Sequence, residues 1–357
     1  MRTTTMTQTP PMPPGYLDTP AAWRSADLAP GEWAHVLSVA EAAEIAAAAR
    51  ALAARDLDLA TVTAADFPLP AFGPRLAALH RGEVLEGRGF AVIRGLDPQA
   101  FSRRENGALF LGIGAHLGAF RPQNAAGHIL GHVKDLGRSG DDPNARLYQT
   151  HERQTYHTDS CDVVGLYCLK PAKAGGRSSL VSSVTLYNEM RRRAPELAAA
   201  LFQPIETDRR GEVAAGELPW FNIPVFNWFE GCFAGMYQRQ YIESARRFSE
   251  VPPLTETQVA ALDLLDALAE DPALHLEIDF QPGDIQLVNN HVLFHDRTAF
   301  EDWPEPERRR HLLRLWLAPP DAQALPPVFA ERFGTAAPGA RGGVTVSPDR
   351  WVAPLEA

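Results

Sequence analysis

From about residue 128 onward, the sequence is a series of short strand-like runs separated by glycine, proline and aspartate, and this pattern constrains the fold most strongly. The runs are HILGHVKDL (128–136), RLYQTHERQTYHTD (146–159), VVGLYCL (163–169), SSLVSS (178–183), LHLEIDF (274–280), GDIQLVNNHVLFHDRT (283–298) and RRHLLRLWLAP (309–319). Many short strands with regular turn signals are typical of a β-sandwich or jelly roll. We therefore expect a mainly β core with helical decoration, an α+β protein.

Four segments carry helical patterns and set the expected domain organisation. They cover residues 38–56, with Ser38 and Glu41 as a candidate capping box, and residues 102–118, 185–203 and 255–271. Because helices lie between two groups of strands, one interrupted domain is favoured over two. We expect a flexible arm at 1–25, a single domain at 26–357 with a helical insert at about 185–271, and a C-terminal extension from about 321.

Charge and cysteine content exclude several classes of protein. The formal net charge is −10, from 34 basic and 44 acidic residues, which disfavours a nucleic-acid partner. Three cysteines without a C-x-x-C pair indicate neither a disulfide framework nor a zinc ribbon. The N-terminus has no apolar signal-peptide region, and charged residues interrupt the alanine-rich run at 38–54, so no membrane span is predicted. We expect a cytoplasmic protein acting on a small molecule, with homo-oligomer formation left open.

The stretch QTYHTDSCD (154–162) places His157 and Asp159 two residues apart, so in an extended strand their side chains share one face. A third ligand is available in NNHVLFHDRTAF (289–300), which contains His291 and His295. These two histidines are four apart on a strand, so periodicity does not choose between them. Two histidines and one carboxylate on a β scaffold suit Fe(II) with open coordination positions. Zinc more often takes a closed tetrahedral set, or three ligands and a water.

A second His-x-carboxylate pair, His275 and Glu277, has the same spacing but a different context. In LHLEIDF, apolar residues alternate strictly with His275, Glu277 and Asp279. Such alternation predicts the solvated face of a half-buried strand rather than a metal site.

Three blocks together resemble a known family: YHTDSCDVVGLYCLKPAKAGGRSSLVSS, PGDIQLVNNHVLFHDRTAFED and RRRHLLRLWL. Their order and spacing, from about residue 87 to 320, resemble the taurine dioxygenase (TauD/TfdA) superfamily of Fe(II)- and 2-oxoglutarate-dependent oxygenases. The resemblance implies a double-stranded β-helix core of the cupin-like, jelly-roll type. It also implies that Fe(II), 2-oxoglutarate and O₂ are required.

The resemblance assigns roles to individual positions. His157, Asp159 and His295 match the iron ligands, and His291 remains a neighbour. Arg310 falls where the family places the arginine that binds the distal carboxylate of 2-oxoglutarate, and a guanidinium suits this role because it can make two charge-assisted hydrogen bonds. Ser178 stands where many relatives have a threonine that also contacts that carboxylate.

Alternation along residues 310–317 supports the assignment of Arg310. Arg310, Leu312, Arg314 and Trp316 are predicted to share one face of a strand, and His311, Leu313, Leu315 and Leu317 the other. A buried arginine needs an anionic partner. For Arg314, that partner is expected to be an anionic substrate, the co-substrate, or an internal acid such as Asp284.

The resemblance implies oxidation of an unactivated C–H bond, by hydroxylation, desaturation or ring closure, with release of succinate and CO₂. The expected substrate is a small anionic or amino-acid-like molecule, with Tyr148, Gln149, Arg239 and Arg314 as candidate contacts. The aromatic segment PWFNIPVFNWFEG (219–231) is expected to be irregular, either a pocket wall or core. A zinc-dependent hydrolase and a non-catalytic metal-binding jelly roll are the alternatives, and neither needs Arg310 and Ser178.

Overall fold

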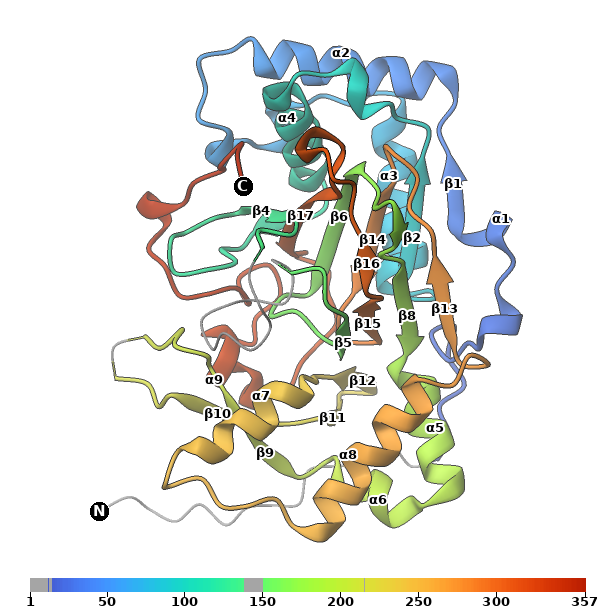
Figure 1. Cartoon of the computed structure of the whole chain (residues 1–357), viewed down its shortest axis with the longest axis vertical. Helices are drawn as coiled ribbons and strands as arrows, with labels where there is room; N and C mark the ends of the chain where they lie inside the picture. Colours follow the sequence, from blue (N-terminus) through green and yellow to red (C-terminus); the bar gives the residue numbers. More distant parts are fainter. Residues whose placement is uncertain (1–11, 13–14, 138–149, 215) are drawn as a thin grey trace.

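The core of the protein consists of two antiparallel-rich sheets that face each other, as a computed structural model shows for residues 12, 15–137, 150–214 and 216–357 (Figure 1). The larger sheet has seven strands in the order β1-β2-β14-β6-β17-β3, with β4 also paired to β17. Its strands are β1 (Ala34–Val36), β2 (Phe90–Arg94), β3 (Ala119–Phe120), β4 (Leu130–Val133), β6 (Val163–Lys170), β14 (Ile285–Asn289) and β17 (His311–Ala318).

The smaller sheet has four strands in the order β13-β8-β15-β5. They are β5 (Gln154–His157), β8 (Ser178–Ser182), β13 (His275–Ile278) and β15 (Leu293–Arg297). Apolar side chains from both sheets, such as Val164, Leu180 and Trp316, pack into one buried cluster between them. The predicted double-stranded β-helix core is confirmed.

Helices cover the outer face of the larger sheet, at the top of Figure 1. They are α2 (Val39–Ala53), α3 (Phe72–Leu79) and α4 (Arg103–Ala115), which form the largest core cluster with strands of that sheet. The predicted capping box is present, because the Ser38 side chain accepts from the backbone N–H of Glu41 and the Glu41 side chain accepts from the backbone N–H of Ser38. The α4 glycines are packing positions: a Cβ on Gly112 would lie 2.3 Å from the Phe67 ring.

The segment from 183 to 271 covers the open end of the smaller sheet and contains strands as well as helices. Its helices are α5 (Ser183–Arg193), α6 (Pro195–Ala200), α7 (Arg239–Ser244) and α8 (Glu256–Ala269). The helix predicted at 185–203 is divided, because Pro195 starts a new helix at its first position. The aromatic segment expected to be irregular forms strands instead, within the hairpins of β9 (Pro204–Asp208) with β10 (Trp220–Pro224) and β11 (Phe226–Phe229) with β12 (Cys232–Gly235). Two short strands pair with each other beside the smaller sheet: β7 (Ala174–Gly175), just before β8, and β16 (Phe300–Glu301), just after β15.

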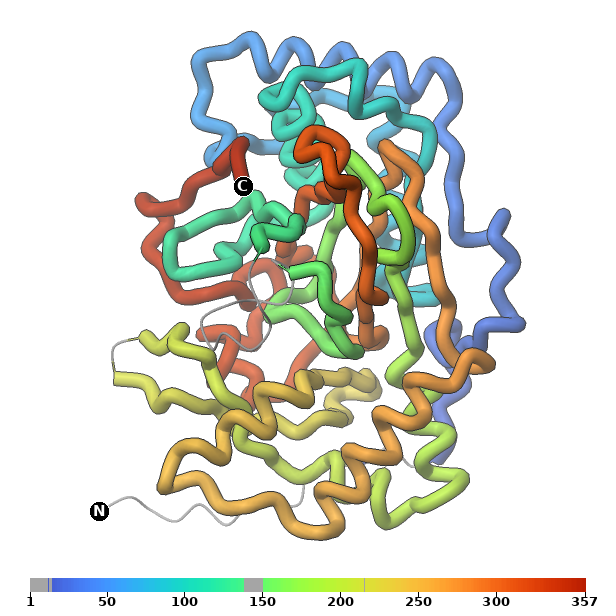
Figure 2. The backbone as a smooth tube through the Cα atoms, in the orientation of Figure 1, coloured from blue at the N-terminus to red at the C-terminus, as the bar shows by residue number. Residues whose placement is uncertain are grey.

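The two ends of the described chain pack against this core. The predicted arm does not extend to residue 25, because Leu17, Ala21 and Trp23 are buried; residues 1–11 and 13–14 lie outside the described part. The short helix α1 (Pro30–Trp33) follows. The C-terminal extension contains α9 (Ala330–Phe333) and then runs along the left side of Figure 2 toward α4. Within the described residues, no helix is long and apolar enough to span a membrane.

Candidate metal centre

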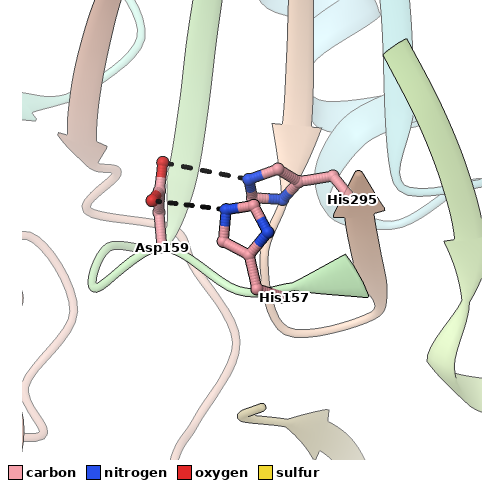
Figure 3. A group of neighbouring side chains, drawn as sticks. All are labelled: His157, Asp159 and His295. Carbon is pink, nitrogen blue, oxygen red and sulfur yellow. Dashed lines mark ion pairs between the residues drawn. The ribbon is translucent and has the colours of Figure 1, made fainter. Parts of the chain in front are cut away.

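Three side chains from the smaller sheet and its adjoining loop converge between the two sheets. His157 ends β5, Asp159 follows in the next loop, and His295 lies on β15, where it pairs directly with His157. One ligand atom from each of the three lies within 4.8 Å of the others, and Figure 3 shows both imidazoles turned toward the carboxylate. The sequence prediction that His157 and Asp159 meet one distal histidine is matched by this geometry.

The surroundings of His157 make Nε2 the ring nitrogen that carries the lone pair. Its Nδ1 lies 2.8 Å from the carbonyl oxygen of Thr155, and a ring N–H donated there leaves the lone pair on Nε2. That Nε2 is 4.0 Å from Asp159 Oδ1 and accepts from the Gln154 side chain at 2.9 Å. Burial lowers the pKa of His157, although the nearby Asp159 charge opposes the shift. His157 is therefore neutral at physiological pH, as metal ligation requires.

His295 is also held neutral. Burial, together with the neighbouring His157, lowers its pKa to about 3. Its Nε2 lies 3.9 Å from Asp159 Oδ2.

Asp159 is held as an anion by groups on β17. Burial alone would raise its pKa, but Arg314, the two histidines and Trp316 together keep the pKa below its ordinary value. Trp316 Nε1 donates to Asp159 Oδ2 at 2.8 Å, and Arg314 Nη1 lies 3.3 Å from the same oxygen. Two neutral imidazoles and one anionic carboxylate on one side of a cavity are a donor set that suits a facial iron site.

The same cavity is lined by arginines from β15 and β17. Its lining includes the three candidate ligands and Gln154, Ser178, Phe280, Asp296, Arg297, Arg310, Leu312 and Arg314. The predicted shared face of Arg310, Leu312 and Arg314 is thereby confirmed.

Arg310 is a buried cation that forms no ion pair with any described residue. Its side chain is 3% exposed, its Nη1 has no hydrogen-bond partner, and its Nη2 lies 3.5 Å from the carbonyl oxygen of Gly176. Burial lowers its pKa to about 10. Gly176 adopts φ +68°, and a Cβ there would lie 3.0 Å from Arg310 Nε, so this glycine leaves room for the guanidinium. The residues present therefore fit a dicarboxylate that chelates a metal at one end and reaches Arg310 with the other.

Ser178 lies on β8 in the same cavity and is 5% exposed. Its hydroxyl donates to Gln286 Oε1 at 2.9 Å.

His291 lies outside the group that includes His295, in the turn between β14 and β15. Its Nε2 is 2.6 Å from Asp162 Oδ1, and Arg341 Nε donates to the same oxygen at 2.7 Å. Each of these three side chains is at most 3% exposed, so His291 belongs to a closed, ion-paired cluster.

The remaining predicted residues lie in different places. Arg239 does not line the cavity, because Glu243, Asp263 and Asp266 on the helical insert bind its guanidinium at 2.7–3.0 Å. Tyr148 and Gln149 lie outside the described residues. The alternative that an internal acid pairs with Arg314 holds, but the acid is Asp159 and not Asp284, which binds Arg94 at 2.8 Å.

The second His-x-carboxylate pair, His275 and Glu277, lies on β13 and is not part of the metal centre. The Glu277 side chain is exposed and pairs with Arg177 at 2.9 Å, which confirms the solvated face predicted for that strand.

Sequence reasoning missed Gln123, Gln154 and Arg297. Gln123 accepts from Arg314 Nε at 2.8 Å and so helps orient that guanidinium; it is distant in sequence from every motif. Arg297 follows His295 by two residues, and this period-two spacing was an available signal.

Comparisons with known proteins define the class. The family model "Taurine catabolism dioxygenase TauD, TfdA family" matches residues 53–316. The FR-33289 synthase of Streptomyces rubellomurinus is 31% identical over 80% of this chain and 85% of its own length. The taurine hydroxylase-like protein SAT17 of Stachybotrys chartarum is 32% identical over 80% of this chain and 77% of its own. A solved asparagine oxygenase, in complex with Fe(II), hydroxyasparagine and succinate, superposes with a TM-score of 0.62 at 18% identity, over 80% of this chain and 93% of the other.

The chain belongs to the TauD/TfdA family. It is accordingly a non-heme iron dioxygenase that depends on 2-oxoglutarate.

Proposed function

We propose that His157, Asp159 and His295 bind the Fe(II) ion, and that Arg310 binds the distal carboxylate of 2-oxoglutarate together with Ser178, whose hydroxyl turns from Gln286 Oε1 to donate to it. The observation that carries this proposal is the buried guanidinium of Arg310 in the cavity that contains the three donors. A buried cation without an anionic partner costs stability unless a ligand supplies one. A zinc hydrolase would have no use for this cation.

The protein residues prepare the site before any ligand arrives. Because His157 and His295 are neutral and Asp159 is ionised, no proton has to leave the three donors when a metal binds. Trp316 and Arg314 hold the carboxylate in one orientation. When bound, iron with 2-oxoglutarate and O₂ supplies the oxidising power for C–H oxidation, and the cavity places the substrate and limits water.

The substrate is a small anionic molecule whose charged group lies near Arg314. Arg314 lines the cavity, is 7% exposed and has Asp159 as a charged partner. Once Asp159 shares its charge with a metal dication, the guanidinium has less compensation, and a substrate anion would restore it. The family description refers to taurine, a sulfonate, which is consistent with such a group.

Succinate formation with a panel of small sulfonates, carboxylates, phosphonates and amino acids tests the proposal. We expect the wild-type protein with Fe(II) to form succinate from 2-oxoglutarate, at a rate that rises with an anionic member of the panel. Arg314→Gln should raise the KM for that substrate about tenfold or more while slow substrate-independent succinate formation continues.

Two outcomes would contradict parts of this proposal. Failure of the folded, iron-loaded protein to consume 2-oxoglutarate would contradict the co-substrate assignment. Preference for neutral compounds, or loss of 2-oxoglutarate binding in Arg314→Gln, would contradict the anionic-substrate assignment.

A further inference from the structure

The loop that carries Asp159 is held on the side away from the cavity by residues distant in sequence. The Asp159 N–H donates to Asn290 Oδ1 at 3.1 Å, and the Asn290 N–H donates to the carbonyl oxygen of Asp162 at 2.9 Å. Asn290 precedes β15, the strand of His295. These hydrogen bonds therefore link the Asp159 loop to the segment that leads into the strand of His295.

A buried ionic cluster extends this junction to the C-terminal extension. We use "support cluster" for Asp162, His291 and Arg341. Asp162 Oδ1 accepts from both His291 Nε2 and Arg341 Nε, and Arg341 is fully buried. His291 also contacts the C-terminal extension, since its ring centroid lies 6.0 Å from that of Phe329.

Arg341 uses its whole guanidinium to bind separate segments. Its Nη1 donates to the carbonyl oxygen of Ala336 at 2.9 Å, and its Nη2 donates to that of Gln323 at 2.7 Å. Only a planar fork with several fixed donors can meet these two carbonyls and the Asp162 carboxylate at once. Arg341 therefore fixes the fold of the extension and docks it on Asp162.

Backbone contacts next to Arg341 reach the residue that follows Asp159. The N–H of Gly343 donates to the carbonyl oxygen of Ser160 at 2.7 Å. Gly342 adopts φ +93°, and a Cβ there would lie 3.1 Å from the same oxygen. The close approach of the two backbones depends on this pair of glycines.

We propose that Arg341 is a positioning residue for the metal centre, and that the C-terminal extension acts through it to hold Asp159 toward the two histidines. This inference rests on the metal site proposed above. The extension lies beyond residue 316, where the match to the family model ends. Removing Arg341 would release the Asp159 loop on one side and leave Asp162 with His291 alone. Loss of such an outer contact typically weakens metal affinity by 10–100-fold.

Binding of Mn(II), measured by the loss of the free-ion EPR signal, tests this inference without any turnover. We expect Arg341→Met to weaken Mn(II) binding roughly 10–100-fold. Arg341→Lys, which keeps the charge but not the fork, should fold and give an intermediate loss. The matched control is Arg94→Met: it removes the arginine partner of another buried carboxylate, Asp284, at the opposite end of β14 from Asn290. That variant should lose thermal stability and keep the wild-type affinity for Mn(II).

Each outcome bears on the inference. Wild-type affinity for Mn(II) in folded Arg341→Met, or an equal loss of affinity in Arg94→Met, would overturn the positioning role of Arg341. Neither result would contradict the proposed metal site. Failure of both Arg341 variants to fold would make Arg341 a general stability residue and would also overturn the positioning role. If the wild-type protein binds no Mn(II) or Fe(II), the proposed metal site itself fails.

Discussion

Two histidines four residues apart, His291 and His295, occupy opposite kinds of environment. Both lie beside a carboxylate, His291 buried and His295 with 14% of its side chain exposed, and burial lowers the pKa of each. His291 is 2.6 Å from Asp162, whose charge is shared with Arg341. His295 is 3.9 Å from Asp159, and its ring centroid lies 4.2 Å from that of His157, which lines the same cavity.

The difference shows what separates a structural histidine from a candidate ligand. Around His291, the imidazole, carboxylate and guanidinium bind one another directly, so the group is complete without a ligand. Around His295, three donors point at one space and their mutual distances are too long for hydrogen bonds, which suits an ion between them. A perturbed pKa does not distinguish the two histidines, whereas the geometry of their partners does.

The largest expected effect is the loss of iron binding in His295→Ala. His157→Ala and Asp159→Ala should have the same effect, because each removes one of three donors. His291→Ala should retain at least part of the Fe(II) binding, while losing about 2 kcal/mol of unfolding free energy through the lost hydrogen bond to the Asp162 carboxylate. Anaerobic Fe(II) titration and chemical denaturation measure the two quantities. Equal and complete loss of iron binding in His291→Ala and His295→Ala would contradict the conclusion that His291 is structural and His295 is the ligand.

The sequence predicted the face of β17 but not the partners of its arginines. Period-two alternation is a backbone property, so it correctly placed Arg310, Leu312 and Arg314 in one cavity. The Arg314–Asp159 pair depends on how β17 packs against a loop 155 residues earlier, and spacing carries no information about such packing. For the same reason, periodicity alone did not choose between His291 and His295. The family resemblance favoured His295, and the positions of Asp159 and Asp162 agree with that choice.

The C-terminal extension was not predicted to take part in the site at all. Arg341 lies among glycines, prolines and alanines, a composition that reads as a loop. Its burial against Asp162 is a tertiary contact over 179 residues and has no local signal.

Arg310→Leu should have the next largest effect. It should change the cavity that contains His295 and leave the cluster around His291 unchanged. Loss of two charge-assisted hydrogen bonds is expected to weaken 2-oxoglutarate binding by about 3 kcal/mol, roughly 100-fold. Fe(II) affinity should stay near that of the wild type. Isothermal titration with 2-oxoglutarate in the presence of Mn(II) measures the change, and an unchanged affinity would move the role to another cavity arginine.

The same variant should not lower stability in the absence of 2-oxoglutarate. The pKa of Arg310 is lower in the folded protein than in the unfolded chain, so below about pH 10 the charged guanidinium destabilises the folded state. Leucine removes that cost at neutral pH. A large fall in the melting temperature of ligand-free Arg310→Leu would show that the charge stabilises the fold instead.

The smallest effect is expected for Arg239→Ala. This variant changes an ion-paired cluster on the helical insert that contains neither His291 nor His295. The three carboxylate partners of Arg239 are partly or largely exposed, and such pairs contribute about 1 kcal/mol or less. The KM for substrate and the iron affinity should therefore remain at wild-type values, with a slightly lower melting temperature. A clear rise in KM would return Arg239 to the substrate site.

The most direct measurement of the central claim is the visible absorption of the protein after anaerobic addition of Fe(II) and then 2-oxoglutarate. The account predicts a weak charge-transfer band that requires both additions, is retained in His291→Ala and is absent in His295→Ala. No band in the folded wild-type protein, or an equal band in folded His295→Ala, would contradict the assignment of this cavity as the iron and 2-oxoglutarate site.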